Sequence, residues 1–395
     1  MEDFGFRILK KSPRSQARLG LLKTPHGRVR TPAFVVVATQ ATVKTLSPKE
    51  LKEIGVQIVL ANTYHLYLRP GPEIVAKLGG LHRFMNWPAP LMTDSGGFQI
   101  FSLKEGLEQG IGKIFPEEKA SIKNDNIKEQ IKKNQSKLVK VTEKGVEFTS
   151  YLDGSKHFFM PELSIKIQKQ LGADIIFTFD ECTSPLAGYD YTKKAMERTH
   201  RWTERCIQEF KVKNSKSKVK QVLFGIVQGG EYKDLREESA KFIASYPFFG
   251  FGIGGSLGKS KKDMRNILEW TIPHLPERKP RHLLGIGRPE DIREAVKRGI
   301  DFFDCVWPTR IARNGTFIIS EKETIKITQA KYKKSKAPIM KNCLCYCCQN
   351  FTRAYLHYLF RANEILALRL ASLHNLTFMI NFMAKMRREI KEAKL

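Results

Sequence analysis

An alternation of strand and helix, repeated about eight times, constrains the fold of this chain more than any other feature of its sequence. Each repeat starts with a short apolar run, ends in a glycine-rich or polar cluster, and in most cases continues into a helix-like segment. The runs are residues 33–37, 57–60, 90–92, 175–179, 222–227, 249–253, 282–284 and 302–303. This alternation predicts an α/β fold with a parallel sheet, and about eight repeats favour a closed TIM (β/α)₈ barrel over an open doubly wound sheet.

Two helix starts fit the alternation. Ser47, Pro48 and Glu50 form a capping box with proline in the first turn, which predicts a helix after the first run. A second helix is expected to begin at residues 288–291, whose acidic first turn suits the helix dipole, and to stop near Gly299. In a barrel of this kind the chemistry lies at the carboxyl ends of the strands, which is where the polar clusters fall in this sequence.

The tightly clustered cysteines predict a metal site. Four of the seven cysteines lie within residues 343–348, too close together for a disulfide framework. A C-x-C-x-x-C motif and a later histidine supply the candidate ligands Cys343, Cys345, Cys348 and His374. Three thiolates and one imidazole make a closed tetrahedral site, so we expect one structural Zn²⁺ per chain. Cys347 competes as a ligand and His357 is a nearer rival to His374, although the neighbours of His357 favour a packed helix.

The sequence divides into a barrel at residues 1–320 and a zinc-binding helical subdomain at residues 321–395. A basic linker at residues 322–341 precedes the cysteines, and the zinc site would attach two helices, residues 353–373 and 376–394, to the barrel. A Lys-rich insertion at about residues 104–135 interrupts the barrel. Its composition is typical of a solvated surface loop, and an RNA-contacting arm is the alternative.

The charge of the chain indicates a polyanionic partner. Lys and Arg number 68 against 40 Asp and Glu, a net charge of +28. This surplus favours nucleic acid first and an anionic membrane surface second, with general lysine richness as the alternative. No stretch approaches the roughly 20 continuous apolar residues of a spanning helix, and residues 1–18 lack the apolar core of a signal peptide. We therefore expect no membrane partner, and the clustered thiols indicate a reducing cytoplasm.

Carboxylates at the predicted strand ends suggest chemistry on a sugar. Asp94 lies in a glycine-rich turn, Asp180 and Glu181 follow an apolar run, and Asp304 is flanked by large apolar residues. Several carboxylates on one rim suit a substrate that develops positive charge, such as an oxocarbenium ion. A structural turn for Asp94 and a buried ion pair for Asp304 are the alternatives. Two nearby arginines, at positions 310 and 313, would grip phosphates, which predicts nucleotide-sugar chemistry on a polynucleotide.

At these motifs the sequence resembles the tRNA-guanine transglycosylases of the bacterial type, also called queuine tRNA-ribosyltransferases. The matching stretches are LMTDSGGFQIFSL (91–103), DGSKHFFMP (153–161), FDECT (179–183), GIVQGG (225–230), GFGIGG (250–255), LGIGRPED (284–291), FDCVWPTRIARNG (303–315) and the cysteine–histidine element. They run in order across nearly the whole chain. The resemblance implies a TIM barrel with a zinc subdomain, acting as a pentosyltransferase in queuosine formation. Such an enzyme exchanges the wobble guanine of tRNAs with GUN anticodons for a 7-deazaguanine.

The resemblance also implies roles for individual residues. Asp304 would be the nucleophile that attacks the ribose and forms a covalent tRNA intermediate, and Asp94 would be the general acid and base. The positions that match base recognition are Ser95, Phe98, Asp180, Gln228, Gly254 and Gly255. Those that match the RNA-binding stretches are Gly285, Gly287, Arg288, Pro289, Asp291, Thr309, Arg310, Ile311, Ala312 and Arg313. The implied partners are the anticodon arm of tRNA, a 7-deazaguanine base and a second copy of the chain in a homodimer.

The chain departs from the family pattern at two places. Residues 104–135 form an inserted block with no counterpart, after which the family's Ser-Lys-Leu segment resumes at residues 136–138. After Gly255 the chain continues Ser256-Leu257-Gly258, without the acidic residue that helps to bind the aminomethyl group of the queuosine precursor. The incoming base is therefore open between 7-aminomethyl-7-deazaguanine, which the family favours slightly, and queuine.

Two alternative functions are less well supported by the sequence. The archaeal-type transglycosylase, which modifies the tRNA D-arm, usually carries additional C-terminal RNA-binding domains, whereas this chain ends at Leu395 just past the expected zinc helices. A non-catalytic tRNA-binding or partner subunit of a transglycosylase would lose the catalytic carboxylates, whereas Asp94 and Asp304 are both present. We therefore expect an active enzyme.

Overall fold

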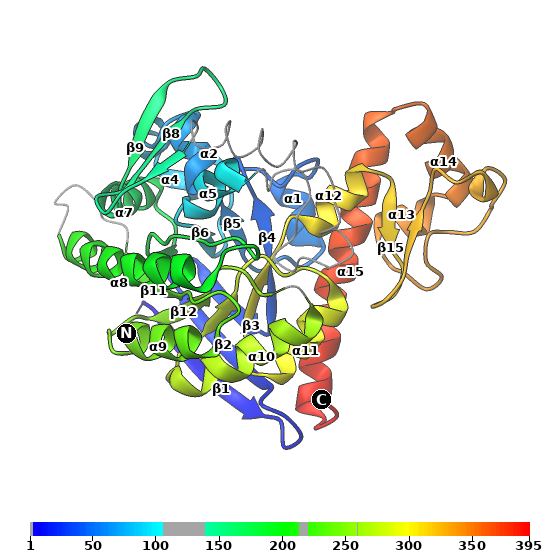
Figure 1. Cartoon of the computed structure of the whole chain (residues 1–395). Helices are drawn as coiled ribbons and strands as arrows, with labels where there is room; N and C mark the ends of the chain where they lie inside the picture. The colour runs from blue at the N-terminus through cyan, green and yellow to red at the C-terminus, as the bar shows by residue number, and fades with distance from the viewer. Residues whose placement is uncertain (1–2, 106–138, 213–219, 259) are drawn as a thin grey trace.

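The computed structural model describes residues 3–105, 139–212, 220–258 and 260–395 (Figure 1). The predicted insertion at residues 104–135 lies outside these residues except for its first two positions. The described residues form a closed barrel, three small antiparallel sheets, and a C-terminal helical region beside the barrel (Figure 1).

The barrel consists of parallel strands in the order β4-β5-β6-β10-β11-β12-β13-β14, with β14 pairing back to β4. Their bounds are β4 Ala33–Ala38, β5 Val59–Ala61, β6 Leu91–Thr93, β10 Ile175–Phe177, β11 Val222–Val227, β12 Gly250–Ile253, β13 Arg281–Leu283 and β14 Phe302–Asp304. Each strand overlaps one of the runs expected from the sequence. The prediction of a TIM barrel is confirmed.

Alternate strand residues face inward and outward, as the two-residue period of a strand requires. In β4, Ala33 and Val35 belong to the hydrophobic cluster inside the barrel, whereas Phe34 and Val36 belong to the larger cluster between strands and helices. Both faces of each strand are therefore buried, which explains why the strands have apolar runs rather than an alternating pattern.

Helices follow the strands and cover the outside of the barrel (Figure 1). Their bounds are α1 Pro48–Glu53, α2 Thr63–Leu68, α3 Pro72–Lys77, α4 Gly80–Phe84, α5 Gly97–Glu105, α7 Pro161–Leu171, α8 Tyr189–Lys211, α9 Lys233–Ala244, α10 Lys261–Thr271, η3 Ile272–His274, α11 Pro289–Lys297 and α12 Trp307–Arg313. The capping box at Ser47 is present, with the side chains and backbone of Ser47 and Glu50 bonded reciprocally. The second predicted helix start is also confirmed, since α11 begins at Pro289 and ends two residues before Gly299.

Two three-stranded antiparallel sheets were not expected from the sequence. β1 Gly5–Lys11, β2 Arg18–Thr24 and β3 Gly27–Thr31 lie at the amino ends of the barrel strands, where Arg18 forms a buried ion pair with Asp301 just before β14. β7 Val139–Val141, β8 Val146–Thr149 and β9 Lys156–Phe159 precede α7 and add aromatic side chains to the core. Hairpins of this kind interrupt the strand–helix repeat without disturbing its order.

The C-terminal region corrects one prediction about helix boundaries. It contains β15 Thr316–Ile318, β16 Thr324–Lys326, η4 Ala330–Tyr332, α13 Tyr346–Asn350, α14 Arg353–Arg361 and α15 Ile365–Lys391. The predicted break between residues 373 and 376 is wrong, because α15 runs unbroken through His374. The chain turns instead at Asn363, which adopts a left-handed conformation with φ of 56°. Asparagine tolerates this conformation better than most residues, so the turn had a local signal that the prediction missed.

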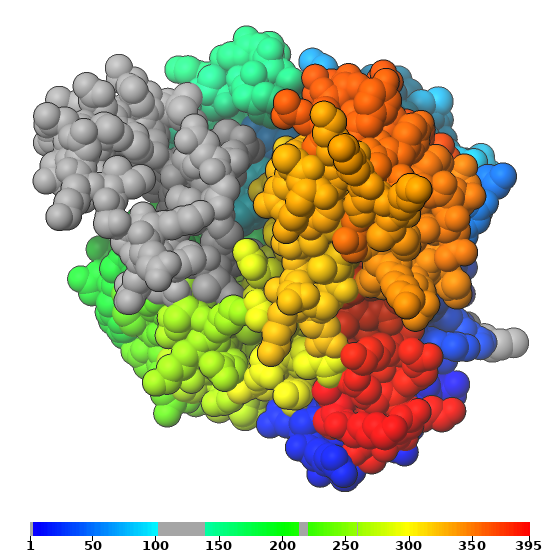
Figure 2. All heavy atoms as spheres, turned by 90° about the vertical axis from the view of Figure 1, so that its right-hand side faces the viewer, coloured from blue at the N-terminus to red at the C-terminus, as the bar shows by residue number. Residues whose placement is uncertain are grey.

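Helix α15 joins two hydrophobic cores. Ala367, Leu370 and Ala371 pack with the cysteine-bearing segment, whereas Met379, Met383 and Met386 pack into the main cluster around the barrel. Figure 2 shows the cysteine-bearing segment in orange above the red end of α15, both on one side of the molecule. The sequence-based division at residue 320 stays a prediction, since α15 contributes to both cores.

Helix α15 is also the only helix in the described part of the chain that is long and apolar enough to cross a membrane. Arg369, His374 and Asn375 interrupt its apolar residues, so it contains no continuous apolar stretch of the length expected for a spanning helix. In the structure 61% of its most apolar window is buried inside the protein, which is the behaviour of a core helix.

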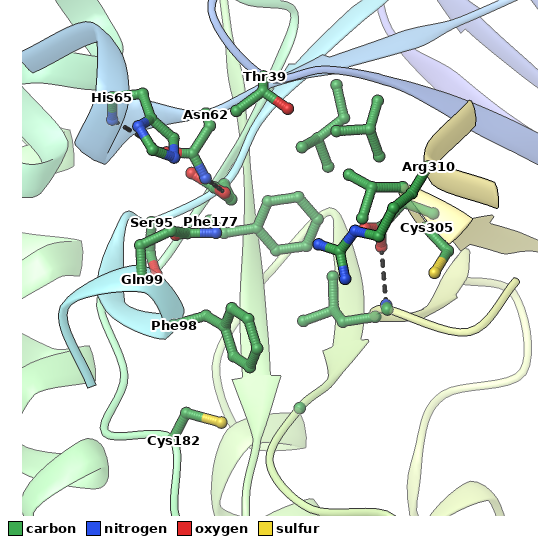
Figure 3. A pocket seen from close by; sticks show the side chains of 18 of the residues that line it. Thr39, Asn62, His65, Ser95, Phe98, Gln99, Phe177, Cys182, Cys305 and Arg310 are labelled. Carbon is green, nitrogen blue, oxygen red and sulfur yellow. Dashed lines mark hydrogen bonds between the residues drawn. The ribbon is translucent and has the colours of Figure 1, made fainter. Parts of the chain in front are cut away.

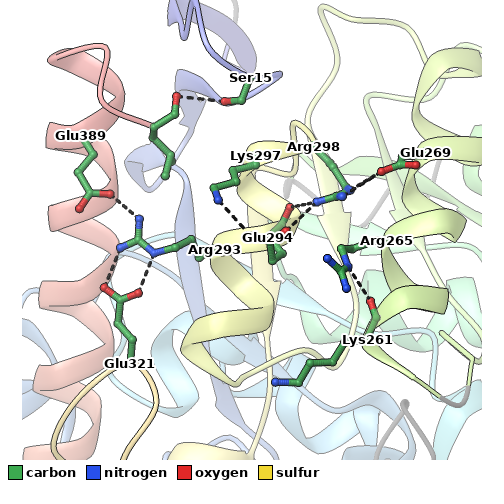
Figure 4. A network of polar contacts seen from close by, with 11 residues as sticks. Ser15, Lys261, Arg265, Glu269, Arg293, Glu294, Lys297, Arg298, Glu321 and Glu389 are labelled. Carbon is green, nitrogen blue, oxygen red and sulfur yellow. Dashed lines mark hydrogen bonds and ion pairs between the residues drawn. The ribbon is translucent and has the colours of Figure 1, made fainter.

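An ion-pair network fastens the far end of α15 to the barrel (Figure 4). Arg293 of α11 binds Glu321 with two nitrogens, each 2.7 Å from a carboxylate oxygen, and Glu389 of α15 at 2.6 Å. Lys385 of α15 lies 3.0 Å from Glu321. The bidentate geometry on Arg293 makes this network more rigid than a single surface pair.

Candidate active site and metal centre

A cavity of about 420 Å³ opens at the carboxyl ends of the barrel strands (Figure 3). The predicted site residues that line it are Asp94, Ser95, Phe98, Asp180, Gly254, Gly255, Gly285, Asp304, Thr309, Arg310 and Arg313. Several strands contribute, so residues far apart in the sequence meet around one space. In Figure 3 the ring of Phe98 and the guanidinium of Arg310 approach this space from opposite sides.

Asp94 directly follows β6 and lies in a polar cradle formed by the end of β5. Its Oδ1 accepts hydrogen bonds from the backbone N–H groups of Thr63, at 2.8 Å, and Gly96, at 3.2 Å. The amide of Asn62 donates to Oδ2. Burial raises the pKa of Asp94 to about 7, and the charge of Asp304 adds to the increase, while these hydrogen bonds oppose it. The carboxyl group is therefore able to hold or release a proton near neutral pH.

Asp304 is the last residue of β14, and its carboxylate is oriented by His282 of the neighbouring strand β13 and by Gly285 just after that strand. His282 Nε2 donates to Oδ1 at 2.9 Å, and the backbone N–H of Gly285 donates to the same oxygen at 3.1 Å. The side chain of Asp304 is 15% exposed, whereas that of His282 is fully buried. Asp304 thus presents an oriented carboxylate to the cavity, held by a buried histidine of the neighbouring strand.

Asp180, Ser95 and Gln228 form a second polar group in the cavity wall. Asp180 accepts hydrogen bonds from Ser95 Oγ at 3.0 Å and from Gln228 Nε2 at 2.6 Å. The Oε1 atom of Gln228 is buried and has no hydrogen-bond partner among the described residues. Gln228 is itself buried behind the lining residues, and its side chain leaves no room for a Cβ at Gly255, which would lie 2.3 Å from Oε1.

Glu181 does not face the cavity, although it follows the same strand as Asp180. It is 1% exposed, pairs with Arg198 and accepts a hydrogen bond from Tyr191 at 2.6 Å. Among the strand-end carboxylates singled out from the sequence, Glu181 is therefore an ion-pair partner.

The predicted RNA-binding residues fall into exposed and buried groups. Arg288 and Arg310 are exposed, and Arg288 lies over the ring of Trp307 at 5.6 Å. Arg313, Gly285 and Ile311 are partly buried. The residues Gly287, Pro289, Asp291, Thr309 and Ala312 are buried. The buried group would support RNA contacts through the backbone, and all ten assignments stay predictions.

Three residues with evident roles in the site were missed from the sequence. Asn62 had a signal, because it opens the polar cluster after β5, but nothing distinguished it as a partner of Asp94. Arg236 of α9 donates hydrogen bonds to backbone carbonyls at the ends of β11 and β12. His282 lies inside a strand-like run and Arg236 inside a helix, where sequence alone does not show which way a side chain points. Their contacts depend on which strands are neighbours.

The predicted zinc ligands form one buried cluster. His374 Nδ1 lies 3.9, 3.4 and 3.2 Å from the sulfurs of Cys343, Cys345 and Cys348, in that order. Bond lengths of about 2.3 Å for Zn–S and about 2.0 Å for Zn–N in a tetrahedron give separations of this size. His374 Nε2 donates a hydrogen bond to the carbonyl of Ile318 at 2.9 Å, which fixes the orientation of the ring and leaves Nδ1 facing the sulfurs.

Both competing ligands are excluded from the cluster. The candidate metal ligands with mutual distances within 4.8 Å are Cys343, Cys345, Cys348 and His374, without Cys347. His357 Nδ1 instead bonds the carbonyl of Ile327 at 2.8 Å. Four protein ligands complete the coordination of zinc and leave no open position for catalysis.

A second group of possible ligands lies at the opposite end of the barrel. His26 Nδ1 donates to the buried Asp174 at 2.7 Å, and His82 Nε2 lies 3.5 Å from the other carboxylate oxygen. The two imidazole rings are stacked 3.5 Å apart and nearly parallel, so their in-plane lone pairs do not converge on one point. This geometry fits an ion pair around a buried carboxylate rather than a metal site.

Comparison with known proteins shows the family to which this chain belongs. The profile of the family described as queuine tRNA-ribosyltransferase matches residues 14–395, nearly the entire chain. The chain belongs to this family. A queuine tRNA-ribosyltransferase from Thermoanaerobacter sp. (strain X514) is 50% identical over 396 residues, which cover 100% of this chain and 96% of the relative.

Two further queuine tRNA-ribosyltransferase relatives come from distant organisms. The protein from Herpetosiphon aurantiacus is 51% identical over 376 residues, covering 95% of this chain and 86% of the relative. A putative queuine tRNA-ribosyltransferase from Archaeoglobus fulgidus is 48% identical over 399 residues, which cover 98% of this chain and 96% of the relative. The resemblance found from the sequence is confirmed, and the Cys₃His cluster is the structural zinc site of this queuine tRNA-ribosyltransferase family member.

Proposed function

We propose that this member of the queuine tRNA-ribosyltransferase family exchanges the wobble guanine of tRNAs with GUN anticodons for a 7-deazaguanine base. The observation that carries the proposal is the pair Asp94 and Asp304, which line one cavity at the carboxyl end of the barrel, with the pKa of Asp94 raised to about 7. Glycosyl transfer with retained configuration needs such a pair, one carboxylate as nucleophile and the other as acid and base.

Asp304 is the proposed nucleophile. Its carboxylate attacks C1′ of the wobble ribose, the bond from C1′ to guanine breaks, and the base leaves with the bonding electrons. Asp94, protonated near neutral pH, gives its proton to the departing base. The product of this step is a covalent ester between Asp304 and the tRNA.

The second displacement reverses the roles. Asp94, now ionised, removes a proton from the incoming 7-deazaguanine, whose nitrogen attacks C1′ and releases Asp304. Two inversions retain the configuration at C1′. The fixed orientation of Asp304 by His282 and Gly285 supports this scheme, because an attacking carboxylate must be held in line with the bond that it breaks.

The base would bind against the group of Asp180, Ser95 and Gln228. These side chains and the backbone of Gly254 and Gly255 offer the donors and acceptors that a guanine-like edge requires. Gln228 lies behind the lining residues and would contribute by holding the carboxylate of Asp180 through its Nε2 amide. The ring of Phe98, 38% exposed beside the cavity, would cover the face of the base.

The incoming base is proposed to be 7-aminomethyl-7-deazaguanine, with queuine as the alternative. The segment after Gly255 supplies Ser256 and the buried Leu257, without an acidic side chain for an aminomethyl group. Offering both bases in parallel to enzyme and tRNA loaded with labelled guanine, and comparing kcat/KM for release of the label, decides between them.

The proposed partners are the anticodon arm of tRNA and a second copy of this chain. Arg288, Arg310 and Arg313 would hold phosphates around the wobble nucleotide.

Exposed apolar side chains on the zinc-bearing segment support a homodimer, and these are Leu344, Tyr346, Tyr355, Tyr358 and Ile365. The clustering of three cysteines in a metal-binding site, rather than in a disulfide framework, supports a reducing cytoplasmic location.

Replacement of the nucleophile tests the proposed function. We expect Asp304→Asn to lower base exchange by at least about a thousandfold and to abolish the denaturant-stable adduct between protein and tRNA, because an amide is a poor nucleophile. The measurements are release of labelled guanine and denaturing gel electrophoresis, with tRNA binding as the control. If the variant exchanged the base at the wild-type rate, Asp304 would not be the nucleophile. A wild-type chain that binds tRNA but never exchanges the base would indicate a non-catalytic partner subunit instead.

A further inference from the structure

Arg236 on α9 is a fully buried arginine with an unusual set of partners. Its Nε donates to the carbonyl of Gly230 at 2.7 Å, and its Nη1 to that of Val227 at 3.3 Å. Its Nη2 donates to the carbonyls of Gly254, at 3.1 Å, and Ser256, at 2.7 Å. One guanidinium thus binds the backbone of two separate loops, one after β11 and one after β12.

The charge of Arg236 has no carboxylate partner among the described residues. Burial lowers the pKa of Arg236 to about 9, so the group remains charged at neutral pH. A buried charge is expensive unless hydrogen bonds replace its hydration, and carbonyl oxygens of the two loops do so here. Because the loops satisfy this charge, displacing either of them would expose an unpaired buried cation to an apolar surrounding.

The two loops that Arg236 joins form one wall of the proposed base site. The first carries Gln228, whose amide bonds Asp180, and the second carries Gly254 and Gly255. The loops approach so closely that a Cβ on Gly254 would lie 2.9 Å from Gln228 Nε2. A shift of a few tenths of an ångström between them would change the donors and acceptors offered to a base.

We infer that Arg236 is a positioning residue that holds the two base-recognition loops at the separation required by a guanine-like base. This inference rests on the proposed base exchange. Arg236 touches neither the ribose nor Asp304 in this arrangement, so its effect belongs to base recognition rather than to the covalent step.

Only arginine has the geometry for this task. Its planar fork carries donors on three nitrogens that point in different directions, and all three are used. A lysine would present three donors on a single nitrogen, which is unable to span carbonyls on both loops. Arg236→Lys therefore keeps the positive charge but loses the simultaneous hydrogen bonds to both loops.

The experiment compares Arg236→Lys with Arg281→Lys in the full-length, zinc-loaded protein. Arg281 is a matched control, because it is also buried, also donates to backbone carbonyls (Leu275 and Gly299), and lies at the amino end of β13, away from the cavity. Steady-state exchange gives separate KM values for tRNA and for the incoming base, and thermal unfolding gives Tm. Titration calorimetry with guanine measures base binding directly.

We expect Arg236→Lys to raise KM for the base and the Kd for guanine by at least about tenfold, with KM for tRNA within about twofold of wild type. Arg281→Lys should lower Tm to a similar degree and leave KM for the base unchanged. If Arg236→Lys is not recovered folded, Arg236→Gln, which keeps a planar N–H donor group, takes its place with the same expectation.

A variant at Arg236 that loses stability but keeps wild-type KM for the base and wild-type guanine affinity would overturn the inference. The same result for both arginines, with KM for the base raised equally, would do so too, because it would show a general effect of destabilisation. Failure of the proposed function is distinguishable, since the wild-type enzyme would then show no base exchange at all.

Discussion

Asp94 and Asp304 are both aspartates at strand ends, yet their surroundings give them different chemistry. Asp304 is oriented by donors on one oxygen and reaches the cavity as a fixed carboxylate. Burial raises the pKa of Asp94 to about 7, and the nearby charge of Asp304 adds to the increase. A carboxyl group with a pKa near 7 is suited to acid–base work near neutral pH.

The raised pKa of Asp94 predicts a specific pH dependence of stability. An aspartate in the unfolded chain titrates near pH 3.9, so between about pH 4 and 7 the folded protein holds a proton that the unfolded chain has released. The free energy of unfolding should therefore fall as the pH rises through this window. The contribution is fully present below about pH 4, is lost progressively, and levels off above about pH 7.

Asp94→Asn removes this titration and serves as the reference. The difference in unfolding free energy between wild type and variant, measured by urea denaturation, should decline from pH 4 to 7. A difference that stays flat over this range would show that Asp94 titrates normally. The variant should also lose base exchange while retaining tRNA binding.

At the scale of elements, α15 shows how one helix serves two cores. Its first turns pack beside the cysteines, His374 in its middle is the fourth zinc ligand, and its last turns pack against the barrel. The zinc ion thereby connects the short elements of the cysteine segment to a helix that is already fixed by the barrel and by the Arg293 network. The break expected between residues 373 and 376 does not occur, so the fourth ligand lies within a continuous helix.

Loss of one thiolate should release zinc and loosen this segment. We expect Cys345→Ala to reduce the zinc content well below one ion per chain and to lower Tm by several degrees, since structural zinc sites contribute directly to folding. Elemental analysis and calorimetry measure the two effects.

The neighbouring Cys347 provides the matched control. Cys347 is fully buried in the same core but is not part of the ligand cluster, so Cys347→Ala should retain one zinc ion. Equal loss of zinc in both variants would contradict the ligand set, and a metal-free Cys345→Ala protein of wild-type stability would contradict a structural role.

At the scale of the whole molecule, barrel closure gathers the site. β14 with Asp304 pairs with β4, and β6 with Asp94 pairs with β10, so both carboxylates meet above the same ring of strands. The net charge of +28 is a property of the whole chain. Arg310 and Arg313 of α12 place two of the positive charges at the cavity itself.

Binding of tRNA should therefore depend steeply on salt. Each phosphate contact releases about one counterion, so log Kd should rise linearly with log salt concentration, and Arg310→Gln should reduce that slope by about one. Fluorescence anisotropy with labelled tRNA, measured from about 0.05 to about 0.3 M salt, gives the slopes.

Lys10 supplies a control for the general effect of charge. It is exposed on β1 at the amino end of the barrel, where it bonds the carbonyl of Lys391. Lys10→Gln should leave the slope unchanged. An unchanged slope for Arg310→Gln as well would show that Arg310 makes no phosphate contact.

The sequence by itself determined the barrel strands, the capped helices, the zinc ligand types and the family. These features have local signals: an apolar run followed by glycine and polar residues favours a buried strand, and three closely spaced cysteines already define most of a metal site. The positions of Asp94 and Asp304 at strand ends were found in the same way, whereas their proposed catalytic roles came from the resemblance to the family.

Only the tertiary structure decided which of these local features meet. It turned Asp180 into the cavity and Glu181 away from it, chose Cys348 over Cys347, placed His282 beside Asp304, and joined two loops through Arg236. The physical reason is that side-chain direction and strand neighbours are fixed when the barrel closes, by packing between segments that are distant in the sequence. A local pattern names the residues at the end of a strand, and the closed barrel determines which of them face one another.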